Sequence, residues 1–253
     1  MAGVKLRDFP KSELSSAQNR LLAAMSPTLS ARMLPVIEPV LMPRGMVIYE
    51  SGSVQRHVYF PTDSVVSLHY VLEDGASAEM AVVGNDGMVG VARVMGGGGT
   101  SSRAVVLVGG RGFRLPAHVL RLELEASPEL MRLLLRYLQA LLTQMAQTAV
   151  CYRHHTLKQQ LCVLLLLIQD RLPSSEIAIT QELISHTLGV RREGVTEAAG
   201  WLQRNGAIRY RRGHIEIIDR ALLEHHACEC YRVVAKECSR LLTLPVGHHP
   251  RVS

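Results

Sequence analysis

The sequence predicts an α+β fold in which an N-terminal β jelly-roll barrel is followed by a long dimerisation helix and a C-terminal winged helix-turn-helix. Brief apolar runs separated by glycine turns fill residues 31–126, as in small closed β-structures. Helical periodicity begins at Ser127. Further on, two short helical patterns meet at Gly189 and precede an arginine-rich hairpin. We therefore expect five segments: a leader with a short helix (1–30), the barrel (31–126), the dimerisation helix (127–155), the winged helix-turn-helix (156–220), and a C-terminal helix and tail (221–253).

Positive charge is concentrated in one stretch of a chain that is otherwise rich in apolar residues. Of the 253 residues 47% are hydrophobic, which is ample for packed cores, and the formal net charge is +6. Between Gly189 and His214 there are six arginines and two glutamates, a local charge of +4. Such a cluster indicates a polyanionic partner, nucleic acid rather than a membrane. A merely solvated basic face is the alternative at this point.

The chain has the character of a cytoplasmic protein without membrane contact. Its start, "MAGVKLRDFPKSE", is charged and lacks the apolar core of a signal peptide. The longest apolar run, Leu161 to Ile168, is too short to span a bilayer. Five cysteines are an odd number, so we expect reduced thiols.

Within the barrel segment, "VVSLHYVLEDGASAEMAVV" contains two strand patterns on either side of an Asp-Gly pair. An Asp-Gly pair between alternating apolar residues is typical of a tight β-hairpin. We therefore expect these strands to be antiparallel neighbours.

The dimerisation helix begins with Ser127 as its N-cap, followed by Pro128 and Glu129. It carries two apolar seams, which suggests that one packs on the barrel and the other on a second copy of the chain. A single core helix buried on all sides is the alternative. The seams are Met131, Leu135, Leu138, Leu142, Met145 and Leu130, Leu134, Tyr137, Leu141, continued by Gln144.

The following helix starts at Thr156, where Gln159 completes a capping box, and the pair His154-His155 marks the hinge before it. Its apolar sequence indicates a core helix. Beyond Asp219 we expect one amphipathic helix extending to Leu242. Cysteine and histidine residues on that helix have spacings that do not converge, so we expect no metal site; they are His225, His226, Cys228, Cys230 and Cys238.

The helix-turn-helix is predicted from a cap, a turn and a set of small or apolar positions. Thr180 caps a helix over Gln181 to Leu188, and Gly189 makes the tight turn before the second helix. The two helices can pack only if the residues between them are apolar or small. This holds for Ile184, Ser185, Leu188, Val190, Val195 and Ala198.

The second helix presents polar side chains at the end that reaches base edges in a major groove. Arg192 can bond guanine bidentately and Glu193 can accept a hydrogen bond from cytosine. Gly206 ends the helix, and "AIRYRRGHIEII" forms a hairpin wing suited to phosphates. We expect the helix-turn-helix and its wing to bind duplex DNA through Arg191, Arg192, Glu193, Thr196, Glu197, Arg211 and Arg212.

Barrel, long helix and winged helix-turn-helix in this order resemble the Crp/Fnr family of bacterial transcription regulators. "ITQELISHTLGVRREGVTEAAGWLQRNGAI" is similar to that family's DNA-binding signature. The resemblance implies a homodimer on a two-fold symmetric double-stranded operator and contact with RNA polymerase. It also implies base contacts from Arg192, Glu193 and the position of Glu197, where the family usually has a basic residue. The tail beyond Asp219 extends past what the better-known members carry.

The resemblance also implies a cyclic-nucleotide-binding-like sensor barrel with a degenerate pocket. Family members that bind cyclic nucleotides use a Gly-Glu-x-Gly cassette followed by an Arg-Ser or Arg-Ala pair. "VVGNDGMVGVARVMGGGGTSSRAVV" stands in that place, but Met88 replaces the ribose-binding glutamate. A methionine cannot accept the ribose hydroxyl bond. The candidate effector residues are Gly87, Gly90, Arg103, Ala104 and, by family alignment of the long helix, Gln144.

The same alignment places the Leu130-Leu134-Tyr137-Leu141 seam at the dimer interface and leaves the fully apolar seam for the barrel. We follow it as our prediction. The iron–sulfur branch of the family carries N-terminal cysteines, and this chain has none before Cys151. We therefore expect no cofactor beyond an unidentified small-molecule effector.

These observations favour a dimeric, sequence-specific DNA-binding transcription regulator with an unknown signal. One alternative is an effector-independent regulator whose barrel is only a scaffold. Another is an enzyme that uses the barrel cavity. The sequence contains no nucleophile elbow, Walker glycine loop or metal-ligand helix, so we expect no enzyme and no catalytic residues.

Overall fold

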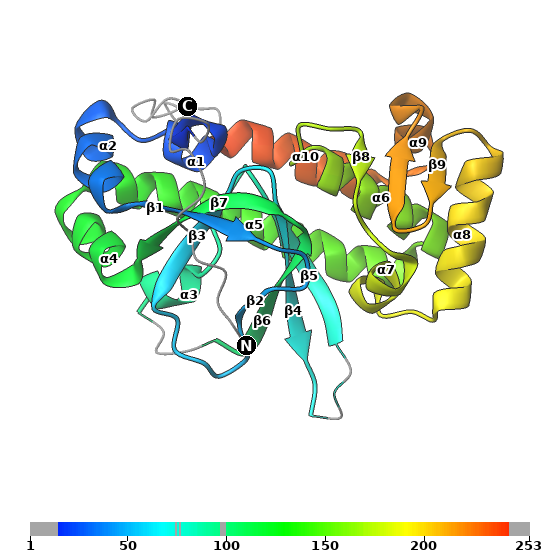
Figure 1. Ribbon diagram of the computed structural model, residues 1–253, viewed down its shortest axis with the longest axis horizontal. Coiled ribbons are helices and arrows are strands. Elements are labelled where there is room, and N and C mark those ends of the chain that lie inside the picture. Colours follow the sequence, from blue (N-terminus) through cyan, green and yellow to red (C-terminus); the bar gives the residue numbers. More distant parts are fainter. Residues whose placement is uncertain (1–14, 74, 76, 97–99, 243–253) are drawn as a thin grey trace, which may run out of the picture.

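The computed structural model describes residues 15–73, 75, 77–96 and 100–242. The molecule consists of a β-barrel and a helical domain joined by one long helix, α5 (Pro128–His154). This helix lies against the barrel and leads into the helical domain at one end of the molecule (Figure 1). The predicted α+β fold, with an antiparallel barrel-like domain before the helix-turn-helix, is confirmed.

The barrel consists of a three-stranded and a four-stranded antiparallel sheet. The first sheet has the order β1 (Glu38–Met42), β7 (Gly110–Pro116), β3 (His57–Pro61). The second has the order β2 (Val47–Tyr49), β6 (Ser102–Val108), β4 (Val65–Val71), β5 (Ser77–Val83). Val66 pairs with Val83 and Val71 with Ser77, so the predicted β4–β5 hairpin is confirmed, whereas Asp74 of its turn lies outside the described residues.

Several short helices pack their apolar residues against the barrel core. The short helix expected in the leader (1–30) is present as η2 (Ser16–Gln18) and α1 (Arg20–Ala23), and α2 (Pro27–Met33) with η3 (Leu34–Val36) follows. α3 (Val91–Val94) lies between β5 and β6. One expectation was wrong: helical structure begins before Ser127, in α4 (Ala117–Ala126), because its apolar residues Ala117, Leu120 and Leu124 fall on one buried helical face.

α5 begins as predicted, since the Ser127 hydroxyl accepts a hydrogen bond from the Leu130 N–H at 3.3 Å. The predicted choice of seam was wrong. Leu130, Leu134 and Tyr137 are at most 6% exposed and belong to the barrel core, whereas Leu135 and Leu142 on the other seam are 56% and 65% exposed. The reason is that Tyr137 and Gln144 have polar atoms that the barrel loops and the helical domain satisfy.

The helical domain contains α6 (Leu157–Gln169), β8 (Glu176–Ile177), α7 (Gln181–Leu188), α8 (Arg192–Arg204), β9 (Ile208–Arg211) and β10 (His214–Ile217). The capping box of Thr156 and Gln159 is present. β8, which the sequence analysis did not anticipate, adds a third strand to the wing in the order β8-β10-β9. α6 is buried along nearly its whole length and forms the centre of this domain, as expected of a core helix.

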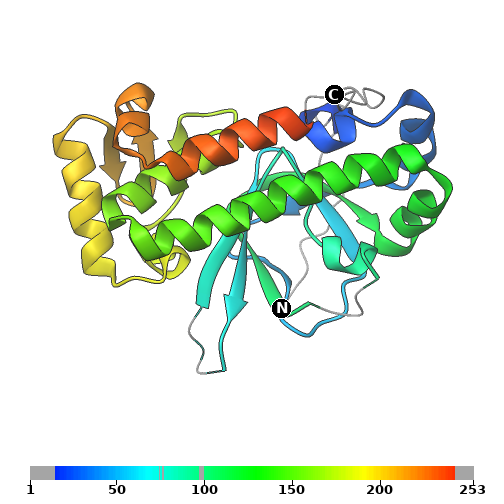
Figure 2. The same cartoon turned by 180° about the vertical axis from the view of Figure 1, so that it is seen from behind.

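The segment after Asp219 forms two helices, α9 (Arg220–His226) and α10 (Glu229–Leu242), so the prediction of a single helix was wrong. Ala227 adopts extended backbone angles (φ −73°, ψ 152°), which turns the chain back. α10 then runs beside α5 (Figure 2), and Gln139 Nε2 donates to Glu237 Oε1 across them at 3.1 Å.

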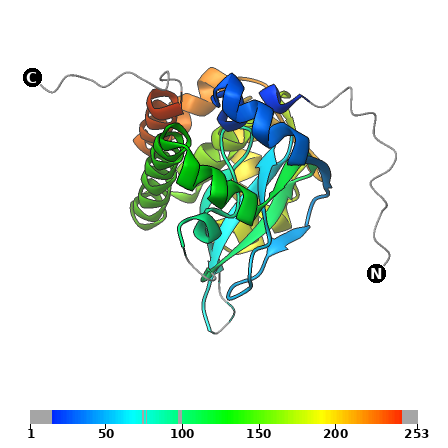
Figure 3. The same cartoon turned by 90° about the vertical axis from the view of Figure 1, so that its left-hand side faces the viewer.

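Viewed along the long axis, α5 and α10 lie together on one side of the barrel (Figure 3). The barrel interior and the inner face of α5 form one core, and α6 to α10 with the outer face of β4, β5 and β6 form a second. In the described part of the chain, none of the helices has the length and apolar character needed to cross a bilayer.

Candidate nucleic-acid interface and effector pocket

The helix-turn-helix is held by local capping and by close packing. The Thr180 hydroxyl accepts from the Leu183 N–H at 3.2 Å. Gly189 has φ +65°, a left-handed conformation that favours glycine, and so reverses the chain within one residue. Ile184 and Val195 are fully buried between the helices, and Ser185 is 7% exposed.

The packing positions predicted from sequence are thereby placed in the interior, with Val190 only partly buried. A Cβ at Gly194 would lie 2.9 Å from Leu157 Cδ2, so glycine at this position permits the close approach of α8 to the start of α6. The buried packing positions and the close approach at Gly194 together fix the orientation of α8.

The N-terminal end of α8 is open to solvent. Arg191, Arg192, Glu193, Thr196 and Glu197 are all exposed. Thr196 Oγ1 lies 2.8 Å from Gln181 Oε1 at the start of α7, so this hydroxyl links the two helices. Among the described residues, the side chains of the two arginines and two glutamates form no ion pair or hydrogen bond with one another or with the rest of the chain. Their charged groups are thus available to an external ligand.

The wing adds two more cations beside this helix. Arg211 and Arg212 are exposed at the turn between β9 and β10. Arg209, by contrast, pairs with Glu216 on the opposite strand at 2.9 Å. The backbone N–H of Tyr210 donates to Gln203 Oε1 at 2.7 Å, which attaches the hairpin to α8. Helix and wing therefore form one surface, and Figure 1 shows them at the end of the molecule far from α4.

The candidate effector residues occupy different surroundings. Gly87 faces the ring of Tyr137, since a Cβ there would lie 2.4 Å from Tyr137 Cε2. The Tyr137 hydroxyl donates to the Met88 carbonyl at 2.6 Å. Burial raises the pKa of this phenol, so it remains a neutral donor. The Tyr137 side chain therefore occupies the space beside Gly87.

Gln144 also has an internal partner. Its Oε1 accepts from Arg171 Nη2 at 3.2 Å, and the same guanidinium pairs with Asp86 at 2.8 Å. Asp86 in turn accepts from the Gly84 N–H at 3.2 Å. Gln144, which family alignment places near a ligand, thus lies close to the 84–90 loop but is hydrogen-bonded to Arg171, which follows α6.

The other three candidates lie apart from this network. Arg103 forms an ion pair with Glu50 at 2.9 Å at the rim of the four-stranded sheet. The neighbouring Ala104 is fully buried in the barrel core. Gly90 has φ +102° and approaches the carbonyl oxygen of His57. The structure therefore groups Gly87 and Gln144 around Tyr137 and Arg171, and leaves Arg103 with a partner elsewhere.

A sizeable cavity in this half of the molecule is apolar. It has a volume of about 320 Å³ and opens beside the exposed seam of α5. Among the residues that the structure describes, its walls are entirely apolar: Met88, Val91, Val94, Met95, Leu124, Met131, Leu134, Leu135 and Leu138. A phosphate or ribose would find no polar partner among these side chains.

Sequence reasoning missed Asp86, Tyr137 and Arg171 as a group. The only available signal was an arginine directly after a strongly apolar helix, where a charged residue must either reach solvent or find a buried partner. Nothing local identifies Asp86 as that partner, because 85 residues separate the two.

Comparisons with known proteins agree with this architecture. Residues 159–226 match the family model of the Crp-like helix-turn-helix domain. The whole structure is similar to a Crp/Fnr-family regulator from Eubacterium rectale (TM-score 0.63, 15% identity, 85% of this chain and 99% of that one). It is also similar to FixK2 of Bradyrhizobium japonicum (TM-score 0.63, 17% identity, 76% and 98%). Residues 159–226 are a Crp-like helix-turn-helix domain, and the chain has the Crp/Fnr fold.

A third structure with this fold is a CRP-family transcriptional regulator from Thermus thermophilus (TM-score 0.62, 19% identity, 74% of this chain and 96% of that one). No match was found among curated protein sequences. The matched Crp-like segment extends from α6 to the end of α9, so it contains every candidate DNA contact.

Proposed function

We propose that the chain is a dimeric transcription regulator that binds a specific sequence of double-stranded DNA. The observation that supports this most directly is the start of α8. Two arginines and two glutamates stand there exposed and without internal partners in the described part of the chain, on a Crp-like helix-turn-helix. At this end of a recognition helix, side chains reach base edges in the major groove.

In this proposal the residues divide into three roles. Arg191, Arg192, Glu193 and Glu197 face the bases, and Thr196 holds the start of α8 against α7. Arg211 and Arg212 bind phosphates beside the groove, which positions the domain without reading sequence. RNA polymerase as a further partner rests on the Crp/Fnr resemblance alone.

Dimerisation through α5 is supported by its exposed seam. Leu135 and Leu142 are 56% and 65% exposed, and Met131 is 42% exposed. The apolar cavity continues this seam toward α3 and α4. A second copy of the same helix would bury both, as at an isologous two-fold interface. Two helix-turn-helix domains would then contact half-sites about 34–36 Å apart, one turn of DNA.

The barrel is proposed as a scaffold rather than as a cyclic-nucleotide receptor. Two contacts favour this alternative. The Tyr137 ring fills the space beside Gly87, and Arg171 is bonded to Asp86 of the 84–90 loop. A regulator of this kind would bind its operator without a small molecule. We propose that the chain is a regulator without enzymatic activity, which its Crp-like helix-turn-helix domain supports; the described wall of the cavity is apolar throughout.

Selection from a pool of random duplexes tests the proposal. The purified chain should enrich a two-fold symmetric sequence, and Arg192→Ala should enrich it with relaxed preference at one G·C position of each half-site. Arg121→Ala is the matched control, because it removes an exposed arginine from α4 at the far end of the molecule. Equal binding to all duplexes, or equal loss in both variants, would contradict it.

A further inference from the structure

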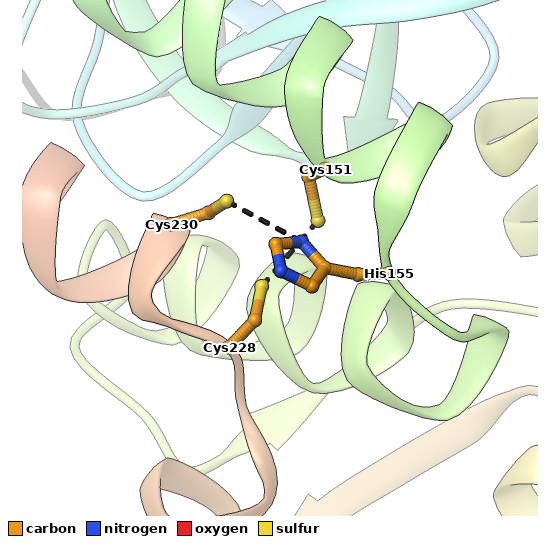
Figure 4. A group of neighbouring side chains, drawn as sticks. All are labelled: Cys151, His155, Cys228 and Cys230. Carbon is orange, nitrogen blue, oxygen red and sulfur yellow. Dashed lines mark hydrogen bonds between the residues drawn. The ribbon is translucent and has the colours of Figure 1, made fainter.

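Four side chains with metal-ligating atoms meet at the C-terminal end of α5. Cys151 lies in the last turn of that helix and His155 is its C-cap, while Cys228 and Cys230 come from the connection between α9 and α10 and the start of α10 (Figure 4). Their three Sγ atoms and one imidazole nitrogen all lie within 4.8 Å of one another. The three cysteines are buried.

We propose that these residues bind a single zinc ion. Thiolates and imidazole in a Cys₃His set are typical ligands of structural zinc. The Sγ atoms of Cys151 and Cys228 are 3.5 Å apart, and Cys230 Sγ is 3.6 Å from His155 Nδ1. With Zn–S of about 2.3 Å and Zn–N of about 2.0–2.1 Å, a tetrahedron has edges of about 3.8 Å and 3.6 Å. These two separations match the edges of a zinc tetrahedron, and the remaining donor–donor separations are no longer than 4.8 Å.

Other uses of the cluster fit less well. A disulfide needs sulfurs about 2.05 Å apart and would join only two of the three thiols. An iron–sulfur cluster places its ligands on different iron atoms and so needs more widely spaced donors. A core of plain apolar thiols gives no reason for an imidazole nitrogen to point among them. One tetrahedral ion uses all four groups.

The surroundings of His155 orient the ring for this role. Its Nε2 lies 3.5 Å from Glu229 Oε1, which leaves Nδ1 directed toward the cysteines. A carboxylate on the far nitrogen of a ligating histidine fixes its tautomer and raises its basicity. The negative end of the α5 dipole also favours a cation at this position.

The backbone around the ring is fixed as well. Gln160 Nε2 donates to the carbonyl oxygen of His155 at 2.8 Å, so α6 holds the end of α5 in place. Binding forms three Zn–S bonds and one Zn–N bond, and the three thiol protons are released to solvent. The ion would tie the end of α5 to the chain that leaves the winged domain. It would thereby fix the connection between α5 and α6 at Thr156, whether or not the proposed DNA binding is correct.

The test uses the full chain, purified with a thiol reductant and without chelator, then loaded with Zn²⁺ and freed of excess. We expect about one zinc per chain by mass spectrometry, as for a closed structural site. Cys228→Ser and Cys230→Ser should each lower this content at least tenfold. Cys238→Ser, on α10 like Cys230 but outside the cluster, is the control and should keep the zinc.

X-ray absorption of the unsubstituted zinc-loaded chain keeps the test decisive if the variants fail to fold. The expected signature is three sulfur neighbours and one nitrogen neighbour at the distances given above. A chain that retains no zinc after loading, a shell of oxygen and nitrogen only, or zinc retained fully in both folded serine variants would overturn the proposal. So would a Cys151–Cys228 disulfide, detected as a loss of both free thiols, in the chain as isolated under reductant.

Discussion

The guanidinium of Arg171 lies 2.8 Å from the carboxylate of Asp86, and both side chains are almost completely removed from solvent. Arg171 follows α6, the central helix of the DNA-binding domain, and Asp86 belongs to the barrel loop that resembles a phosphate-binding cassette. Arg171 also donates to the carbonyl oxygen of Leu167 at 2.6 Å. One buried cation therefore connects the barrel loop, α5 through Gln144, and the DNA-binding domain.

Removing Arg171 should be strongly destabilising. Arg171→Met leaves Asp86 as a buried carboxylate without its partner, which costs about 3–5 kcal/mol of unfolding free energy. Urea denaturation followed by circular dichroism measures this. The double variant Arg171→Met with Asp86→Asn should recover part of the loss, because no unpaired charge remains. Strict additivity of the two single losses would contradict the pairing.

An exposed ion pair provides the comparison for that experiment. Arg32 pairs with Glu123 at 2.9 Å, but the arginine side chain is 47% exposed. Water screens such pairs, and their effect on stability is small. Arg32→Ala should therefore leave the denaturation midpoint nearly unchanged.

Sequence patterns predicted those parts of the fold that depend on near neighbours. The caps at Ser127, Thr156 and Thr180 and the turn at Gly189 each involve residues within a few positions, so local chemistry decides them. The orientation of α5 could not be predicted in this way. Both seams are apolar enough for a core, and Tyr137 faces the barrel because its hydroxyl reaches Met88, 49 residues away.

The cysteine cluster was missed for a similar reason. The sequence "HHACEC" has neither glycine nor proline, so nothing local indicates that the helix breaks at Ala227. The break brings Cys228 to Cys151, 77 residues earlier in the chain. Spacing along one helix could exclude a site within that helix, but it says nothing about ligands from another element.

Glu79 should make stability fall as the pH rises. Burial raises the pKa of this carboxyl from 4.5 to about 8, although the Ser67 hydroxyl and Arg171 act in the opposite direction. Between those two values the folded chain retains a proton that the unfolded chain has lost. Folding then requires proton uptake, so its free energy becomes less favourable with rising pH, and the full penalty is present above pH 8.

Glu79→Gln removes this dependence. At pH 7 the variant should be more stable than the unsubstituted chain by on the order of 3 kcal/mol, and the difference should vanish below about pH 4.5. Denaturation at several pH values measures it. Glu125→Gln, a substitution at an exposed position on α4, is the control and should leave the unfolding free energy unchanged at every pH. A difference that grows toward acid pH would show that Glu79 is ionised in the folded state.

The two faces of α5 should respond differently to a charge. Leu135→Glu places a carboxylate on the exposed seam, so the chain should stay folded but dissociate from dimer to monomer. Leu134→Glu, one position earlier and 6% exposed, should instead destabilise the barrel core. Light scattering with circular dichroism separates the outcomes. A dimer that survives Leu135→Glu would place the interface elsewhere.

Base reading and phosphate binding should be separable on the DNA surface. Arg192→Ala should cost about 1–3 kcal/mol at one G·C position and relax specificity there. Arg211→Ala should weaken binding to all duplexes alike and reduce the slope of log affinity against log salt by about 1. Footprinting and salt titration of both variants make the comparison. Identical profiles would remove the distinction between helix and wing.

Cyclic AMP should have no useful affinity for the barrel. Met88 offers no carboxylate to the ribose hydroxyl, and one missing partner costs about 1–3 kcal/mol, which alone weakens binding only moderately. The occupied loop is the stronger reason. A nucleotide at Gly87 would have to displace the Tyr137 ring and break its bond to the Met88 carbonyl, and Arg103 is held by Glu50 rather than directed at that loop. Calorimetry with cyclic AMP and cyclic GMP should detect no micromolar binding to the unsubstituted chain. Tyr137→Ala opens the space beside Gly87 and should bind either nucleotide more tightly than the unsubstituted chain, although Met88 and the Glu50-paired Arg103 remain. Micromolar binding to the unsubstituted chain that also raised its affinity for DNA would make the barrel a nucleotide receptor after all.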